Sequence, residues 1–176
     1  MWQLMFLAYM AMGVAIIIVT HPLTVILHEL GHAIPAILFT KEKVTIYIGS
    51  YGETEKSLRF RVGLLEVWLK KSIFWKTGLC QTSSNNMSFT KKIIFIVGGP
   101  LASLTFAVVA SYYVFSYDMH GAFKMIMSFF TLAAAWDFFS NIIPSDHPTK
   151  LSNGNVCYND GNSLRKLIYH KRFFLN

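Results

Sequence analysis

Residues 2–19 form an uncharged and mostly apolar segment. At a rise of about 1.5 Å per residue, a helix of this length spans about 27 Å of hydrocarbon. No basic region precedes the segment, and its apolar character continues past any small-residue cleavage site, so we expect a membrane-spanning helix rather than a cleaved signal peptide. A chain that begins in this way must satisfy its backbone hydrogen bonds inside a helix.

The composition supports the same interpretation. Hydrophobic residues make up 53% of the 176 residues and charged residues 14%, with a net charge of +7, whereas soluble domains average about 25% charged residues. The first 40 residues contain no Lys or Arg, so we expect no nucleic-acid partner. Cys80 and Cys157 are isolated thiols, which indicates neither a disulfide framework nor a zinc ribbon. The composition predicts an α-helical integral membrane protein with three to four transmembrane helices, in one domain over residues 1–176.

Four apolar segments are candidates for these helices. Pro22 is suited to the first turn of a new helix, so we favour two separate spans at 2–19 and 22–40 over one long kinked helix. The remaining spans are predicted at 93–115 and 122–143, joined by a short link.

The region 43–90 has a different pattern. Apolar and polar residues alternate at 44–48 and 58–62, and residues 64–69 can supply another strand. With its Trp and Lys residues, the region is predicted to be a small amphipathic β-sheet lying against the bilayer. Residues 82–86 are predicted to be a polar loop.

The distribution of positive charge predicts an orientation. Residues 41–92 hold ten Lys or Arg and residues 150–172 hold five, whereas the link at 116–121 holds none. By the positive-inside rule, the β region and the C-terminal segment 145–176 are expected in the cytoplasm, with a basic helix at 163–175. The compact build favours a bacterial cytoplasmic membrane.

The motif His28-Glu29-Leu30-Gly31-His32 is the most informative feature of the sequence. On a helix with about 100° per residue, His28 and His32 lie one turn apart on the same face, so both imidazoles can reach one metal ion. Glu29 lies beside them, placed to accept a proton from water rather than to ligate. Ionisable residues inside an apolar span are functional by default.

A catalytic zinc site needs a third protein ligand. Asp137 lies inside the last span and could instead orient a ligating histidine. Asp160 precedes Gly161, which permits a tight turn back toward the membrane. The candidates for the third ligand are Asp137, Asp146, His147, Cys157 and Asp160.

Four segments together resemble the site-2 proteases, a family of intramembrane zinc metalloproteases. They occur in the family's order and cover most of residues 20–165. The segments are the zinc-helix motif at 28–32, the strand-like run Thr40 to Ser50, the sequence Gly99-Pro100-Leu101-Ala102-Ser103, and Asn141-Ile142-Ile143-Pro144 followed by Asp160-Gly161.

The resemblance implies one zinc ion per chain, with His28, His32 and Asp160 as ligands and Glu29 as the catalytic acid and base. It also implies that Asn141 positions the substrate. Gly99, Pro100 and Pro144 are further substrate-positioning candidates. Nineteen positions separate Asn141 from Asp160, a longer gap than is common in the family, which keeps Asp146 and Asp137 as alternative third ligands. Ser103 stands where the family often has Asn, and we expect a bare core without a PDZ or CBS domain.

These observations predict a zinc-dependent intramembrane endopeptidase. Its substrate would be a membrane-spanning or membrane-proximal peptide, held by strand addition to an exposed edge of the sheet that contains residues 44–48. A non-catalytic zinc-binding membrane protein and a metal transporter are the alternatives. Glu29 favours the enzyme, because neither alternative needs a base at that position. The oligomeric state stays open.

Overall fold

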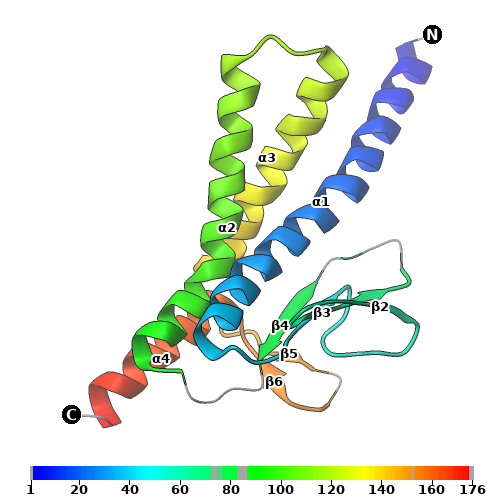
Figure 1. Ribbon diagram of the computed structural model, residues 1–176. Coiled ribbons are helices and arrows are strands. Elements are labelled where there is room, and N and C mark those ends of the chain that lie inside the picture. Colours follow the sequence, from blue (N-terminus) through cyan, green and yellow to red (C-terminus); the bar gives the residue numbers. More distant parts are fainter. Residues whose placement is uncertain (1, 73–74, 76, 83–86, 152, 175–176) are drawn as a thin grey trace.

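The computed structural model describes residues 2–72, 75, 77–82, 87–151 and 153–174. Three long helices dominate it: α1 (Trp2–Thr40), α2 (Phe89–Ser116) and α3 (Gly121–Ile142). Each is long and apolar enough to cross a membrane, by length and composition. α2 and α3 run antiparallel side by side, and α1 crosses them obliquely (Figure 1).

The helix α1 is a single element, so the favoured division into spans 2–19 and 22–40 is wrong. Pro22 and Pro35 both lie inside the helix. Each proline removes only one helical donor, the one for the carbonyl four residues earlier. In a membrane, a break in the helix would leave more backbone groups without a partner than this single carbonyl.

A four-stranded sheet follows α1. Its strands are β1 (Val44–Ile48), β2 (Ser57–Val62), β3 (Leu65–Lys70) and β4 (Gly78–Thr82), in the order β2-β3-β1-β4. β1 pairs parallel with β3 and antiparallel with β4, so it is an inner strand and has no exposed edge. The edges of the sheet that contains residues 44–48 are therefore β2 and β4, and β4 is a strand that the sequence did not predict. The predicted loop at 82–86 lies outside the described residues, apart from Thr82 at the end of β4.

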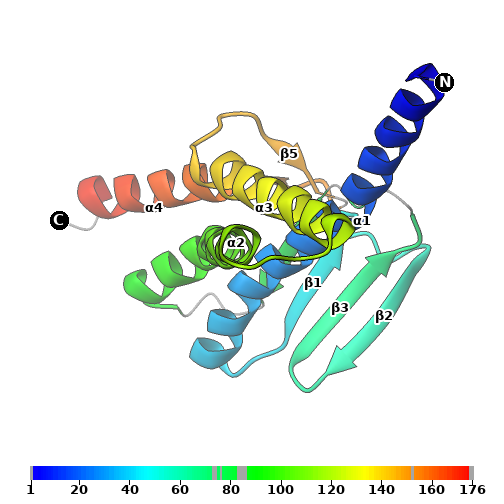
Figure 2. The same cartoon turned by 90° about the horizontal axis from the view of Figure 1, so that it is seen from above.

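The alternation predicted for β1 is confirmed. Val44, Ile46 and Ile48 are buried together with Val25, Ala33 and Ala36 of α1 in one apolar cluster. Burial of this face fixes the sheet against the C-terminal half of α1 (Figure 2).

The last part of the chain forms a short hairpin and a helix. β5 (Thr149–Lys150) pairs with β6 (Val156–Cys157), and α4 (Asp160–Phe174) begins three residues before the predicted helix. α4 packs against α2 and α3.

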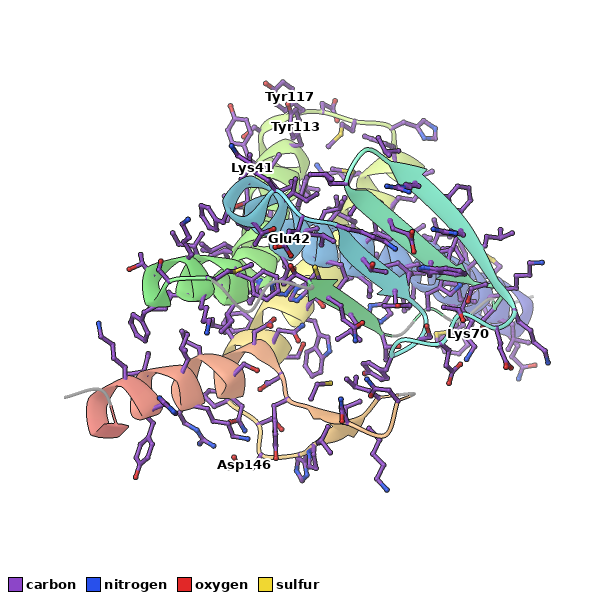
Figure 3. All side chains as sticks on the ribbon, turned by 60° about the horizontal axis from the view of Figure 1, so that its bottom comes forward. Lys41, Glu42, Lys70, Tyr113, Tyr117 and Asp146 are labelled. Carbon is purple, nitrogen blue, oxygen red and sulfur yellow. The ribbon has the colours of Figure 1, made fainter. Side chains whose placement is uncertain are left out.

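The regions rich in Lys and Arg lie at one end of the three-helix arrangement. The sheet, the β5–β6 hairpin and α4 gather at the end where α1 and α3 finish and α2 begins (Figure 1). Tyr117 and the link between α2 and α3 lie at the opposite end (Figure 3). The basic stretches are thus separated from the link, which has no Lys or Arg, as the charge pattern predicted.

The closest approach of α1 and α2 depends on two glycines. A Cβ atom added to Gly31 would overlap the Gly98 carbonyl, and one added to Gly98 would overlap the Gly31 carbonyl oxygen. Small residues allow helix backbones to meet in this way in apolar surroundings.

We therefore expect Gly98→Ala to separate α1 from α2 and to lower the free energy of unfolding by roughly 1–3 kcal/mol, the usual cost of overpacking. Unfolding in mixed detergent micelles, followed by circular dichroism, measures the effect. Gly121→Ala is the matched control, because the added Cβ would meet nothing within 4 Å. Equal stability of the two variants would contradict this account of the crossing.

Glu66 organises the charged face of the sheet. Its buried carboxylate accepts from Lys43 at 2.9 Å, from Arg59 at 2.6 Å and from Trp68 Nε1 at 2.7 Å. Hydrogen bonds from Lys43 and Arg59 are the main reason that the pKa of Glu66 falls from 4.5 to about 2.

Because the pKa is lower in the folded protein, Glu66 stabilises the sheet above pH 4.5, and this contribution disappears as the pH falls toward 2. We expect Glu66→Gln to destabilise the sheet at neutral pH and to lose its difference from wild type as the pH drops through that window. Trp68 fluorescence during denaturation reports the difference. A wild-type advantage that persists at pH 2 would contradict the role of the carboxylate.

Candidate metal centre

His28 and His32 lie on one face of α1, as the motif predicts. Their side chains are buried, with 4% and 5% of the residue surface exposed. The two Nε2 atoms are 3.2 Å apart. The pair therefore forms a compact donor set on the face that α2 covers.

Asp160 joins this pair. Its Oδ2 atom lies 3.1 Å from His28 Nε2 and 3.4 Å from His32 Nε2. His28, His32 and Asp160 form a group that could hold a metal ion. Of the candidates for a third ligand, Asp160 is the one whose carboxylate reaches both imidazoles.

Asn159 determines where Asp160 lies. Its side-chain amide donates to the carbonyls of Ser140 and Ile143 at the end of α3, at 3.0 and 2.6 Å. Its side-chain oxygen accepts from the backbone N–H of Ser145 and of Asn162, so it also caps α4. These bonds tie the start of α4 to the end of α3, although nineteen positions separate Asn141 from Asp160.

Gly161 does not form the tight turn that we expected from the sequence. It lies in the first turn of α4, where a Cβ atom would overlap the Ile142 carbonyl and crowd the Pro144 nitrogen. Its role is close approach between α4 and the end of α3.

The other ring nitrogen of each histidine is also bonded. His28 Nδ1 lies 2.8 Å from the Asp137 carboxylate and 3.1 Å from the Ser103 hydroxyl. His32 Nδ1 donates to the Phe95 carbonyl at 2.7 Å. A carbonyl and a carboxylate only accept, so the Nδ1 atoms carry protons, and the Nε2 atoms are the ring nitrogens that face each other and Asp160. Three electron-rich atoms that converge in this way favour a bound cation.

The charge on Asp160 suits this arrangement. Burial opposes ionisation of the carboxyl group, but the His32 and His28 imidazoles outweigh it and lower the pKa of Asp160 to about 2. The group is therefore an ionised carboxylate, the form that binds metal.

Gly99 lies directly behind the donor atoms. A Cβ atom at this position would overlap His32 Nε2 and lie 2.7 Å from His28 Nε2, so only glycine leaves room for both imidazoles. Pro100 is buried beside it in α2. These contacts place Gly99 against the metal-binding group itself.

Glu29 stands apart from the ligand group. Only 6% of its surface is exposed, and its side chain packs against Gly78 of β4, where a Cβ atom would overlap it. Within the described part of the chain, no group hydrogen-bonds to its carboxylate. It lines a cavity of about 830 Å³ together with His28, His32 and Asp160.

The remaining predicted residues divide into two groups. Asn141 lines the cavity and donates to the Asp137 backbone and side chain at 3.0 and 3.1 Å. Pro144 is exposed in the loop after α3, and Asp146 is exposed and points outward (Figure 3), paired with Arg165. Asp146 and its neighbour His147 are therefore not brought to the histidines, and Asp137 acts behind His28 rather than as a third ligand.

Two thiols also line the cavity. Burial raises the pKa of Cys80 well above its usual range, and the charges of Glu29 and Asp160 add to this effect. Burial likewise raises the pKa of Cys157, which lines the cavity as well. A protonated thiol is a poor metal ligand, which is consistent with a centre built from nitrogen and oxygen.

The sequence analysis did not identify Asn159, Ser103, Phe95 or Gly78 as residues of the site. Asn159 could have been found, because Asn before Asp-Gly is typical of a helix N-cap. Ser103 was noticed only as a departure from a family pattern, whereas the Phe95 carbonyl and Gly78 reach the site through folding alone.

Comparison with protein-family models finds no match for this chain, and comparison with curated proteins finds none either. The resemblance to site-2 proteases therefore rests on the sequence motifs alone.

We expect Asp160→Asn to weaken metal binding strongly, because the neutral amide cannot supply the anionic ligand. Titration of the detergent-purified protein with Zn²⁺ against a competing chelator measures the affinity. Asp146→Asn is the matched control and is expected to leave the affinity unchanged, since that side chain is 78% exposed and paired with Arg165. A larger loss of zinc affinity in Asp146→Asn than in Asp160→Asn would identify Asp146 as the third ligand.

Proposed function

We propose that the chain is an integral membrane zinc endopeptidase that cleaves a peptide bond in or near a transmembrane segment. The observation that carries the proposal is the group of His28 and His32, buried on the apolar helix α1, with Asp160 at the start of α4. The Glu29 carboxylate lies beside this group in the same cavity and has no hydrogen-bond partner among the described residues. A structural role alone would not require a carboxylate next to two imidazoles.

The donor set suits zinc. Two imidazole nitrogens and one carboxylate oxygen match the three-ligand pattern of catalytic zinc sites, which leaves one position open. Zinc bonds of about 2.0–2.1 Å in tetrahedral geometry place ligand atoms about 3.3 Å apart. The three donor atoms lie 3.1, 3.2 and 3.4 Å from one another.

Zinc in such a site supplies Lewis acidity, which activates water and polarises a peptide carbonyl. Glu29 is placed to accept the proton of the attacking water and to return it to the leaving amine. Asp137 and the Phe95 carbonyl hold His28 and His32 in the orientation that directs both Nε2 atoms at the ion.

The edge strand β4 lies where a substrate could pair with it. Gly78, Leu79 and Cys80 of β4 line the cavity, and Gly78 touches Glu29. β4 pairs with β1 on one side, and the strand order leaves its other side open among the described strands. A transmembrane helix must unwind to expose a scissile carbonyl, and addition to β4 would hold the unwound segment extended.

The charge distribution supports an orientation. The sequence stretches 41–92 and 150–172 hold fifteen of the sixteen Lys and Arg. The sheet and α4, which these stretches form, lie at the same end of the three helices (Figure 1). We place this end at the cytoplasmic face of the membrane, most naturally of a bacterial cell. The cavity would then lie near the membrane–water boundary, where water can reach it.

Glu29→Gln should retain about one zinc ion per chain and lose activity by roughly 10²–10⁴-fold, since the amide cannot accept the proton. The assay follows cleavage of transmembrane-segment reporter peptides in proteoliposomes by mass spectrometry, beside metal analysis of the same sample.

Glu42→Gln is the matched control, because Glu42 follows α1 and is exposed. Chelation should remove wild-type activity and zinc should restore it. Undiminished cleavage by Glu29→Gln would rule out this mechanism. Zinc binding without cleavage by the wild type would favour a non-catalytic zinc-binding protein or a transporter.

A further inference from the structure

The charged side chains around the cavity fall into two sets. The acidic residues Glu29, Asp137 and Asp160 all belong to the metal centre or act directly behind it. The lysines that line the cavity are Lys92 of α2 and Lys166 of α4. The proposed function gives no role to either lysine.

Lys92 lacks a counter-ion in the described part of the chain. It is half-buried in the first turns of α2, and no carboxylate there lies within 4.0 Å of its ammonium group. The preceding Lys91 differs, because its ammonium group lies over the Phe39 ring at 5.6 Å from the centroid. Lys92 therefore presents a positive charge to the cavity at a partly desolvated position.

Lys166 is held at the other wall. Its ammonium group lies 3.0 Å from the centroid of the Tyr158 ring, and Tyr158 also lines the cavity. The adjacent Arg165 takes the Asp146 carboxylate as its ion-pair partner. Lys166 is also part of the reason that the pKa of Asp146 is low, although Arg165 is the first cause.

The two lysines and β4 line the same cavity. α4 and the start of α2, which carry the lysines, stand on one side of this end of the molecule, and β4 stands on the other (Figures 1 and 3). A peptide extended along β4 would pass Glu29 and direct alternate side chains toward the lysines. Positive charges at a partly desolvated cavity wall favour the binding of an anionic group beside them.

We propose that Lys92 and Lys166 bind a carboxylate of the substrate close to the scissile bond, so that the enzyme prefers peptides with an acidic group there. The proposal rests on the proposed function and names its substrate class. The carboxylate could be an Asp or Glu side chain or the C-terminus of the peptide, and the two sources share the same recognition chemistry.

Peptide binding tests the preference without catalysis. The protein is zinc-loaded Glu29→Gln in neutral detergent, and the probes are short extended peptides with a neutral dye. One carries a central Glu and an amidated C-terminus, a second has Gln in place of Glu, and a third has Gln with a free C-terminal carboxylate. Fluorescence anisotropy gives each dissociation constant.

The Glu peptide or the free-acid peptide should bind about tenfold more tightly than the neutral peptide, as for one charge-assisted hydrogen bond. Lys92→Gln and Lys166→Gln should each reduce this preference, and raised salt should weaken it. Lys91→Gln and Lys171→Gln are matched controls, since their ammonium groups lie over Phe39 and Phe89 instead. The acidic peptide that binds more tightly than the neutral peptide identifies the source of the carboxylate.

Equal or undetectable binding of the three peptides would overturn the proposal, and so would an equal loss in the control variants. Competition by vesicles with phosphatidylglycerol, but not by neutral vesicles, would assign the lysines to lipid headgroups and also overturn it. Failure of the proposed function would be seen separately, as absent cleavage by wild type in proteoliposomes.

Discussion

The structure depends on how three buried electron-rich atoms share one small space. His28 and His32 direct their Nε2 atoms at each other and at the Asp160 carboxylate, at distances between 3.1 and 3.4 Å. The Nδ1 atoms have acceptors in Asp137 and Phe95, which leaves the Nε2 atoms to face Asp160. The three atoms form a group that could hold a metal ion, and the surrounding helices hold them together.

Close backbone approach makes this arrangement possible. Gly31 and Gly98 allow α1 to meet α2, Gly99 leaves room for both imidazoles, and Gly161 allows α4 to reach the end of α3. A side chain at any of these positions would move a ligand, because the contacts involve backbone or ring atoms that cannot give way. Asn159 completes the set, since its bonds to the end of α3 hold Asp160 in place.

The position of the sheet beside the apolar helices is related to the site. The apolar face of β1 attaches the sheet to α1, and this attachment brings β4 against Glu29. The cavity is therefore lined by β4 and by basic positions of α2 and α4. The proposed protease would use this combination to hold an extended peptide.

The sequence alone determined the features that depend on local periodicity and composition: the apolar helices, the alternation of Val44–Ile48, and the pairing of His28 with His32 one helical turn apart. Tertiary structure decided the features that depend on distant contacts. Asp160 is 132 positions from His28, and the local sequence left Asp146 as an alternative, which the contact of Asn159 with the end of α3 decides. The continuity of α1 through Pro22 and the inner position of β1 were likewise settled by packing, because burial of the backbone and of the sheet face outweighs the local signals of proline and turn residues.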